Sequence, residues 1–520
     1  MLVLLLGALA LPPLAPLWAQ AGAPSRIRAE TLARDLEYLS SDALRGRNTF
    51  SPGFDSAALY IARRLREAGL KPLGDGGGFY QYYSVLEEEV DTAGAYLEIE
   101  GRRFPFGTGF VLLSFAGELG GDLPAAYVGH GWIVRDRGID PYEGVGLHGK
   151  LAVVEGPLAP PAGLGIQRIG RVFPGAVSPL WAARERGAVG LLVLPDSASL
   201  GNWDRLANSN LTRFELDPPV PSAYAAAPLG ALLLSPEAAS ALMAGEAPRG
   251  GVPFELVKKV RVKIPLSAKR VHRGYNVVAM LEGSDPVLRA EYVTVESHLD
   301  GAVGRTPLDG DSIYNAADDN ASGSAVTLAI AEEMAAAGPS RRSVIFIWDS
   351  GEERGLWGTR WFVHRPPVPL DRIVAHFNVD MVGASRAPGS PDSPTPTVTG
   401  PDEVYLIGPG VLSRRLDSLV VAVNRSHLDL KLNRAYDRQE SEFFYPRTDA
   451  GPFLERGIPT VGFFTGLHDR YHRPSDEARY LDPHKMERIA RTVLAIVRAV
   501  ADWDERPRIE QLPPTVARYR

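Results

Sequence analysis

The feature that most constrains the fold is a regular alternation of strand and helix patterns between Tyr275 and Ala501. Apolar runs typical of buried strands cover residues 292–297, 343–348, 375–379 and 460–464. Helical patterns cover residues 323–337 and 483–501. Strands that alternate with helices in this way predict a doubly wound α/β domain, in which helices cover both faces of a central sheet.

The first 265 residues carry two other patterns. Two predicted helices present apolar stripes, and the second ends at Gly69; the stripes consist of Leu32, Leu36, Leu39, Ala57, Ile61, Leu65 and Ala68. Further along, strand-like runs at 151–156 and 190–196 alternate with loops rich in Gly, Pro and Ala. We therefore predict an inserted domain over 120–265, an N-terminal part of the main domain over 22–119, and its core over 266–520.

Residues 1–21 are interpreted as a signal peptide. Residues 2–19 are apolar, but three prolines interrupt them, and a spanning helix needs about 20 good residues. Ala19-Gln20-Ala21 supplies a cleavage pattern of small residues. An uncleaved anchor is the alternative. We expect an exported protein, secreted or held in the periplasm or cell envelope, without stable membrane insertion after cleavage.

The composition excludes several classes of function. The 520-residue chain is 45% hydrophobic and 23% charged, which is ordinary for a globular protein and argues against disorder. Its formal net charge of −6 argues against binding to a nucleic-acid backbone or an anionic membrane. The absence of cysteine excludes disulfides, thiolate metal ligands and thiol catalysis. We expect no nucleic-acid partner, and no feature of the sequence sets an oligomeric state.

Acidic and histidine residues follow every predicted strand of the second half. They are His298 and Asp300 after the first strand, Glu352 and Glu353 after the second, Asp380 after the third and His472 after the fourth, with Asp319 shortly before the helix at 323–337. Because ligands gather outside the carboxyl ends of strands in open α/β sheets, these segments are expected to converge. Two histidines with several carboxylates suit a borderline divalent metal, zinc above all.

The number of candidate ligands favours two metal ions over one. A single catalytic zinc ion needs three protein ligands and a water molecule. Five candidates remain when Glu352 is set aside, and five ligands serve two ions if one carboxylate bridges them. Two ions about 3.5–4 Å apart polarise a carbonyl group and lower the pKa of the water between them. Glu352 is then available as the general base, so the pattern predicts a two-metal hydrolase.

Five segments, in this order, resemble the M28 zinc peptidases, a family that includes secreted bacterial aminopeptidases and glutamate carboxypeptidases. They are ESHLDG, NAADDNASG, SGEERGLWG, NVDMVG and YHRPSDE. The early segment LEYLSSDALRGRNTFSPG is similar to the family's N-terminal portion, and residues 120–265 resemble the protease-associated (PA) domain often inserted in these enzymes. The resemblance implies a three-layer α/β/α sandwich with a mixed, largely parallel central sheet, plus a β-rich PA insert.

The same resemblance implies a ligand set. His298 and Asp380 would bind one zinc ion, Glu353 and His472 the other, and Asp319 would bridge the two. The peptide bond between Asp319 and the next residue is cis in the family.

Three further residues receive roles from the resemblance. Asp300 would orient a metal-bound histidine. Glu352 would take a proton from the bridging water and deliver it to the leaving amine, and Tyr471 would help to hold the tetrahedral oxyanion. The chain departs from the family at Ala450, where histidine is frequent, and at Ala316, where glycine is frequent. Neither position is a ligand, but the first affects which substrates are expected.

Each motif also has an ordinary structural interpretation when it stands alone. An isolated His-x-Asp or a pair of adjacent glutamates is usually a surface or solvated feature. Aspartates before a helix are usual capping residues, Asp380 could form a turn, and His468 and His472 could be exposed loop histidines. Tyr471 could be a packing aromatic. The joint occurrence of these residues at successive strand ends favours the metal site.

The resulting functional hypothesis is an exported two-zinc exopeptidase that acts on peptide substrates, most plausibly as an aminopeptidase. Three alternatives use the same scaffold: a glutamate-carboxypeptidase-like enzyme, a glutaminyl cyclase, and a non-catalytic binding protein. A cyclase needs only one zinc ion, and a binding protein would be expected to lack ligands, whereas this ligand set is complete.

Overall fold

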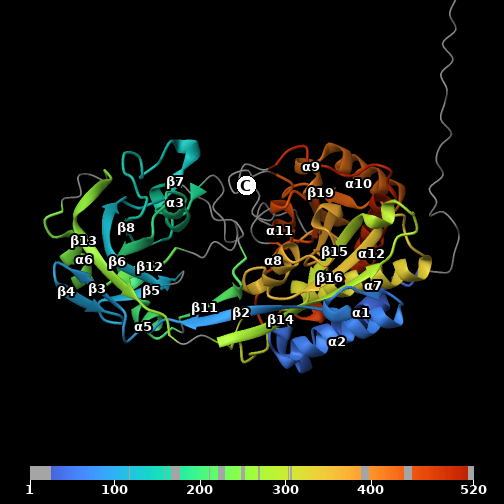
Figure 1. Ribbon diagram of the computed structural model, residues 1–520, viewed down its shortest axis with the longest axis horizontal. Helices are drawn as coiled ribbons and strands as arrows, with labels where there is room; N and C mark the ends of the chain where they lie inside the picture. The colour runs from blue at the N-terminus through green and yellow to red at the C-terminus, as the bar shows by residue number, and fades with distance from the viewer. Residues whose placement is uncertain are drawn as a thin grey trace, which may run out of the picture.

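The computed structural model describes residues 25–115, 118–156, 158–164, 176–209, 211–220, 229–246, 252–267, 270–301, 304, 307–387, 398–438 and 448–512. It forms two lobes joined by long strands that run from one lobe into the other (Figure 1). The predicted signal peptide lies outside the described residues. Among the described helices, none is long and apolar enough to cross a membrane.

The larger lobe is built on a ten-stranded sheet in the order β11-β2-β14-β16-β15-β17-β20-β18-β19, with β1 paired to β14. Its strands are β1 (Lys71–Pro72), β2 (Tyr80–Glu89), β11 (Thr212–Asp217), β14 (Arg270–Leu281), β15 (Tyr292–His298), β16 (Ser343–Asp349), β17 (Ile373–Val379), β18 (Glu403–Ile407), β19 (Lys431–Asn433) and β20 (Thr460–Phe464). The sheet is mixed, as predicted. Its parallel part comprises the central strands β16, β15, β17 and β20 and the edge pair β18–β19, while β11, β2 and β14 pair antiparallel and β18 joins β20 antiparallel.

The central strands agree with the predicted apolar runs, because both of their faces are covered. Every residue of β16 and β17 is buried, as expected of parallel strands between two helical layers. One layer contains α1 (Ala29–Leu39), α2 (Pro52–Glu67), α7 (Gly323–Ala337), α10 (Arg414–Ser426) and α12 (Pro483–Asp502), and the other contains α8 (Trp357–His364) and α11 (Ala450–Glu455). The short α9 (Pro409–Leu412) precedes α10. The three-layer α/β/α prediction is confirmed.

Local sequence explains where the covering helices begin. The Ser51 side chain accepts a hydrogen bond from the Phe54 amide at the start of α2, and Pro52 occupies the first helical position. At α12, the Asp482 carboxylate accepts hydrogen bonds from two amides, and Pro483 follows it. Both helices then bury the stripes that their periodicity predicts, and α2 is followed by Gly69 with a φ of 81°.

The smaller lobe contains an eight-stranded sheet in the order β4-β3-β13-β6-β8-β10-β12-β5. Its strands are β3 (Tyr96–Ile99), β4 (Arg102–Pro105), β5 (Phe110–Ser114), β6 (Leu119–Tyr127), β8 (Leu151–Glu155), β10 (Gly190–Leu194), β12 (Ala231–Leu234) and β13 (Phe254–Ile264), with a separate pair β7 (Ile133–Val134) and β9 (Ala176–Val177). The lobe also holds the short helices α3 (Pro179–Glu185), α4 (Ser197–Leu200), α5 (Trp203–Ala207) and α6 (Pro236–Met243).

The chain enters and leaves the smaller lobe at points that differ from the predicted boundaries. Strands β3 to β5, between Tyr96 and Ser114, belong to its sheet, although the prediction places them in the N-terminal part of the main domain. Conversely, β11 lies within the predicted insert but pairs with β2 in the larger sheet. The reason is that strand pairing, which no local pattern records, decides which sheet a strand joins. That the smaller lobe is a PA domain stays a prediction.

Candidate metal centre

The carboxyl ends of the parallel strands bring the predicted site residues to one edge of the larger sheet. His298 is the last residue of β15, and Asp380 directly follows β17. Glu352 and Glu353 lie in a short 3₁₀ helix, η7 (Glu352–Arg354), after β16. Asp319 lies in η6 (Ala317–Ser322), directly before α7, and the Asp319–Asn320 peptide bond is cis, as the resemblance implies.

Two groups of side chains share Asp319. The His298 Nε2 atom lies 3.2 Å from one carboxylate oxygen of Asp319 and 3.4 Å from Asp380 Oδ1. The His472 Nε2 atom lies 3.0 Å from the other oxygen of Asp319 and 3.1 Å from Glu353 Oε2. The two sets, His298–Asp319–Asp380 and Asp319–Glu353–His472, each place their ligand atoms within 4.8 Å of one another. Asp319 thus belongs to both groups, with one carboxylate oxygen facing each histidine.

The residues present fit a pair of divalent metal ions. The Nε2 atoms of His298 and His472, Asp380 Oδ1 and Glu353 Oε1 are buried and make no hydrogen bond of normal geometry with the described residues. Buried polar atoms without partners are costly, and here they belong to nitrogen and carboxylate donors that face common points. Such mixed N and O donor sets are the ones that zinc uses in catalytic sites.

The electrostatics of the site also favour bound cations. Burial raises the pKa of Glu352 well above its usual value, and the neighbouring Glu353 adds to the shift. Burial likewise raises the pKa of Glu353 to about 7. Burial alone would lower the pKa of His472, but the Asp319 and Glu353 carboxylates raise it to about 10. Crowded carboxylates thus favour positive charge at this point, and divalent ions would supply it directly.

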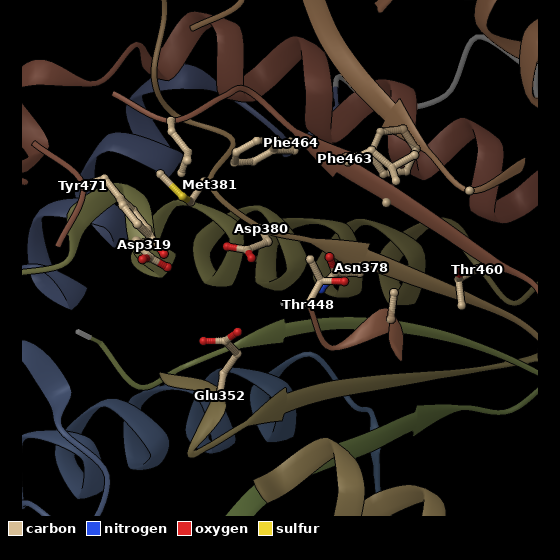
Figure 2. Close-up of a pocket in the computed structure, with 15 residues that line it drawn as sticks. Asp319, Glu352, Asn378, Asp380, Met381, Thr448, Thr460, Phe463, Phe464 and Tyr471 are labelled. Carbon is tan, nitrogen blue, oxygen red and sulfur yellow. The ribbon is translucent and has the colours of Figure 1, made fainter. Parts of the chain in front are cut away.

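The Glu352 side chain belongs to neither ligand group. Figure 2 shows its carboxylate facing those of Asp319 and Asp380 across a cavity. Its backbone amide donates a hydrogen bond to Asp300 Oδ1 at 3.3 Å, which fixes the start of η7. Glu352 is thus in position to act on a molecule held between the ligand groups.

Asp300 supports His298 through its main-chain oxygen and not, as predicted, through its carboxylate. The Nδ1 atom of His298 lies 3.0 Å from the main-chain oxygen of Asp300, whereas the Asp300 carboxylate is 3.9 Å away. The carboxylate instead accepts hydrogen bonds from the Thr49 hydroxyl and the Glu352 amide. The predicted orienting role therefore belongs to the carbonyl group, and the carboxylate joins the N-terminal segment to the Glu352 loop.

A buried arginine connects the N-terminal segment to the segments that carry the candidate ligands. Arg47, in η1 (Asp42–Arg47), donates hydrogen bonds to the main-chain oxygens of Leu299, Asn315 and Ala316 at 2.9 Å each. It thereby connects the residue after His298 with the segment that leads to Asp319.

A cluster of His468, Asp318 and Asp476 lies behind Asp319 and was not predicted. His468 Nε2 lies 3.2 Å from Asp318 Oδ2, and Asp318 Oδ1 accepts a hydrogen bond from the Gly383 amide at 2.7 Å. The Asp476 carboxylate accepts hydrogen bonds from the amides of Asp318 and Asp319 at 3.0–3.2 Å. His468 is therefore not the exposed loop residue of its ordinary interpretation. The only sequence signal was its position four residues before His472.

Replacing Asp476 by alanine should destabilise the protein by about 2–6 kcal/mol, because two buried amides would lose their acceptor at a cost of about 1–3 kcal/mol each. Urea denaturation of the metal-free protein measures this free energy of unfolding. The matched control is Asp469→Ala, which removes an exposed carboxylate from the same loop and should change stability by less than about 0.5 kcal/mol. Equal stability of the two variants would contradict the assigned role of Asp476.

A third group of buried acids, Glu296, Asp349 and Asp449, lies beside the site. The Thr359 hydroxyl contacts both aspartates, and the Asn378 amide donates to Glu296 at 2.8 Å. Burial raises the pKa of all three carboxyl groups well above their usual values. Asp449 directly precedes Ala450, so the segment that departs from the family pattern borders this group.

A cavity opens from the ligand groups. It holds about 650 Å³ of space, part of it open to solvent. Its walls are largely apolar, with Tyr471 beside Asp319 and with Asn378, Thr448 and Thr460 as polar lining residues (Figure 2). The apolar side chains are those of Met381, Ile407, Ala450, Phe463, Phe464 and Leu467. The Tyr471 ring stacks on the His472 ring at a centroid distance of 3.8 Å.

Part of the chain is similar to known peptidases. Residues 276–497 match the profile of Peptidase family M28. A "Probable leucine aminopeptidase" of Arthroderma otae is 25% identical over 218 residues, which cover 40% of this chain and 54% of the relative. "Leupeptin-inactivating enzyme 1" of Streptomyces exfoliatus is 27% identical over 195 residues, or 37% of this chain and 36% of the relative. The chain thus spans about half the length, or less, of the curated relatives it matches.

A solved structure extends the likeness to the whole fold. The "Aminopeptidase from Aneurinibacillus sp. strain AM-1" aligns with a TM-score of 0.50 at 18% identity, covering 94% of this chain and 96% of that one. At this identity the alignment speaks for the fold alone. Residues 276–497, which carry all the ligand-bearing segments, are thus similar to peptidase family M28, and the chain shares the fold of the solved aminopeptidase.

Proposed function

We propose that this chain is an exported aminopeptidase that hydrolyses the first peptide bond of its substrates with two zinc ions. The observation that carries the proposal is the pair of ligand groups that share Asp319, with the Glu352 carboxylate facing them (Figure 2). The names of the relatives, which include leucine aminopeptidases, support the reaction class. The predicted signal peptide at residues 1–21 supports export.

The proposed chemistry assigns one task to each group. Zinc ions, when bound by these ligands, polarise the scissile carbonyl group and make a water molecule more acidic. Glu352 accepts the proton of that water as its oxygen adds to the carbonyl carbon, and then delivers the proton to the amine as the C–N bond breaks. The Tyr471 hydroxyl donates a hydrogen bond to the carbonyl oxygen as negative charge develops there.

The experiment that tests this function is mass spectrometry of a mixed peptide digest incubated with the purified protein. We expect ladders that shorten from the N-terminus, that stop with a chelator and that return with zinc. Shortening from the C-terminus would keep the metal site but overturn the aminopeptidase assignment. No cleavage by zinc-loaded protein would favour a cyclase or a binding protein.

The apolar walls of the cavity predict a preference for apolar N-terminal residues. Burial of a leucine-sized side chain contributes about 1.5–3 kcal/mol, so kcat/KM should be about 10–100 times higher for leucyl than for aspartyl substrates. A series of aminoacyl anilides that differ only in the first side chain measures this ratio. Equal rates across the series would show that Met381, Ile407 and Phe464 do not contact the substrate side chain.

A further inference from the structure

We propose that the smaller lobe positions the loop that carries Glu352 and Glu353, through Phe214 and Glu215 of strand β11. The contribution to catalysis rests on the proposed function, whereas the contribution to metal binding through Glu353 can be measured without it. In this proposal Phe214, Glu215 and Arg360 are positioning residues, since none of them lines the cavity beside the ligand groups.

Strand β11 is a physical connection between the two lobes. The chain leaves the smaller lobe after α5, forms β11 on the edge of the larger sheet, and returns to the smaller lobe at β12. Six residue pairs, from Thr212–Glu89 to Asp217–Ser84, hold β11 against β2. Figure 1 shows β11 beside β2 where the lobes meet. A displacement of the smaller lobe would therefore act on β11 directly.

Arg360 joins β11 to the catalytic loop. This side chain is buried, and one of its terminal nitrogens donates to Glu215 Oε1 at 3.1 Å and to the Val220 main-chain oxygen at 2.9 Å. Its other terminal nitrogen donates to the Gly355 main-chain oxygen at 3.2 Å. Gly355 lies two residues after Glu353. A single guanidinium group thus connects the metal-binding loop with two points of the segment from the smaller lobe.

Phe214 makes a second connection. The Arg354 guanidinium lies 5.3 Å from the centre of the Phe214 ring, and the Trp357 ring lies 5.7 Å from it. The Phe50 ring stacks on the Trp357 ring at a centroid distance of 5.7 Å. Arg354 directly follows Glu353 in the chain. Contacts of a cation with an aromatic face contribute about 0.5–2 kcal/mol, depending on burial.

The loop between β16 and α8 needs such support because Leu356, at its end, has a strained backbone conformation. Gly351 and Gly355 have φ values of 78° and 122°, and Leu356 has a φ of 56°. A non-glycine residue in this region costs roughly 1–2 kcal/mol and persists when its surroundings hold it. Trp357 also packs closely on Gly351, where a Cβ atom would lie 2.6 Å from the indole. Leu356 therefore depends on external contacts, which help to hold the loop that carries Glu352 and Glu353 in this conformation.

The test uses the full-length zinc enzyme with Phe214→Ala and Glu215→Ala. For each variant we expect kcat to fall about 10–100-fold while KM stays within threefold of the parent value. We also expect the second zinc equivalent to bind about 10–100 times more weakly, which is the usual effect of losing the residues that support a ligand. Glu215→Gln keeps an oxygen acceptor for Arg360 and should stay within threefold of the parent in both measurements. Steady-state kinetics and zinc competition with a chromophoric chelator give these values.

The matched control is Phe254→Leu, which removes a half-buried aromatic ring from the smaller lobe, where Phe254 packs on the buried Tyr127. It should leave kcat and zinc affinity unchanged. If Phe214→Ala does not fold, Phe214→Leu replaces it. Unchanged kcat and zinc affinity in both β11 variants would overturn the proposal. If the parent enzyme cleaves no peptide, the proposed function fails, but the zinc measurements still decide whether β11 positions Glu353.

Discussion

Replacing Glu352 by glutamine is expected to reduce peptide hydrolysis by about 10²–10⁴-fold, because glutamine cannot accept and return the proton of the attacking water. The zinc content should not change, since Glu352 faces the ligand groups without belonging to either. Steady-state kinetics on a leucyl anilide and elemental analysis of the same preparation provide the two measurements.

Glu353→Gln is the matched control for this variant. The two glutamates are neighbours in η7, yet only Glu353 lies beside His472, at 3.1 Å. The Glu353 variant should lose zinc together with activity, whereas the Glu352 variant should lose activity alone. A fully active Glu352→Gln protein, free of parent enzyme, would show that the proposed mechanism is wrong.

Substitution of Asp319 or Asp380 is expected to change the number of zinc ions that the protein binds. Asp319→Asn should weaken both zinc equivalents, because an amide offers only one oxygen where the carboxylate faces His298 with one oxygen and His472 with the other. Asp380→Asn should weaken one equivalent only, since Asp380 belongs to one ligand group. We expect two zinc equivalents in the parent, about one in Asp380→Asn and fewer than one in Asp319→Asn after dialysis against a weak chelator.

These counts separate a two-metal centre from a single zinc ion. A parent protein that binds one equivalent at saturation would contradict the bridging role of Asp319. The bridging role would also be contradicted if the Asp319→Asn protein kept one tightly bound zinc ion that the Asp380→Asn protein had lost. Activity measured in parallel shows whether the weaker equivalent is the one that hydrolysis requires.

Much of the larger domain could be predicted because its signals are local. The strand at 460–464 and the helix at 323–337 have the bounds that the apolar patterns predict. Both faces of the central strands are covered, so an uninterrupted apolar run identifies them. The site followed from the same patterns, since residues at the carboxyl ends of parallel strands must meet at one edge.

The smaller lobe was predicted less well for a related reason. The pairing partners of its strands lie far away in the chain: β3 and β13 are neighbours in the sheet although more than 150 residues separate them. Composition indicated an insertion but could not show that β3 to β5 belong to it or that β11 leaves it. Pairing energy depends on contacts across strands, which the sequence of one strand does not contain.

The sequence by itself thus determined the alternating α/β core, the convergence of His298, Asp319, Glu353, Asp380 and His472, and the separate position of Glu352. The tertiary structure alone decided what holds these groups in place: the Asp300 carbonyl group behind His298, the Asp476 carboxylate behind Asp319, and Arg360 between β11 and the Glu353 loop. The physical reason is the distance along the chain over which each feature is determined. Periodicity and strand ends are set by neighbouring residues, whereas buried polar partners are chosen by whichever distant segment the fold brings within hydrogen-bond distance.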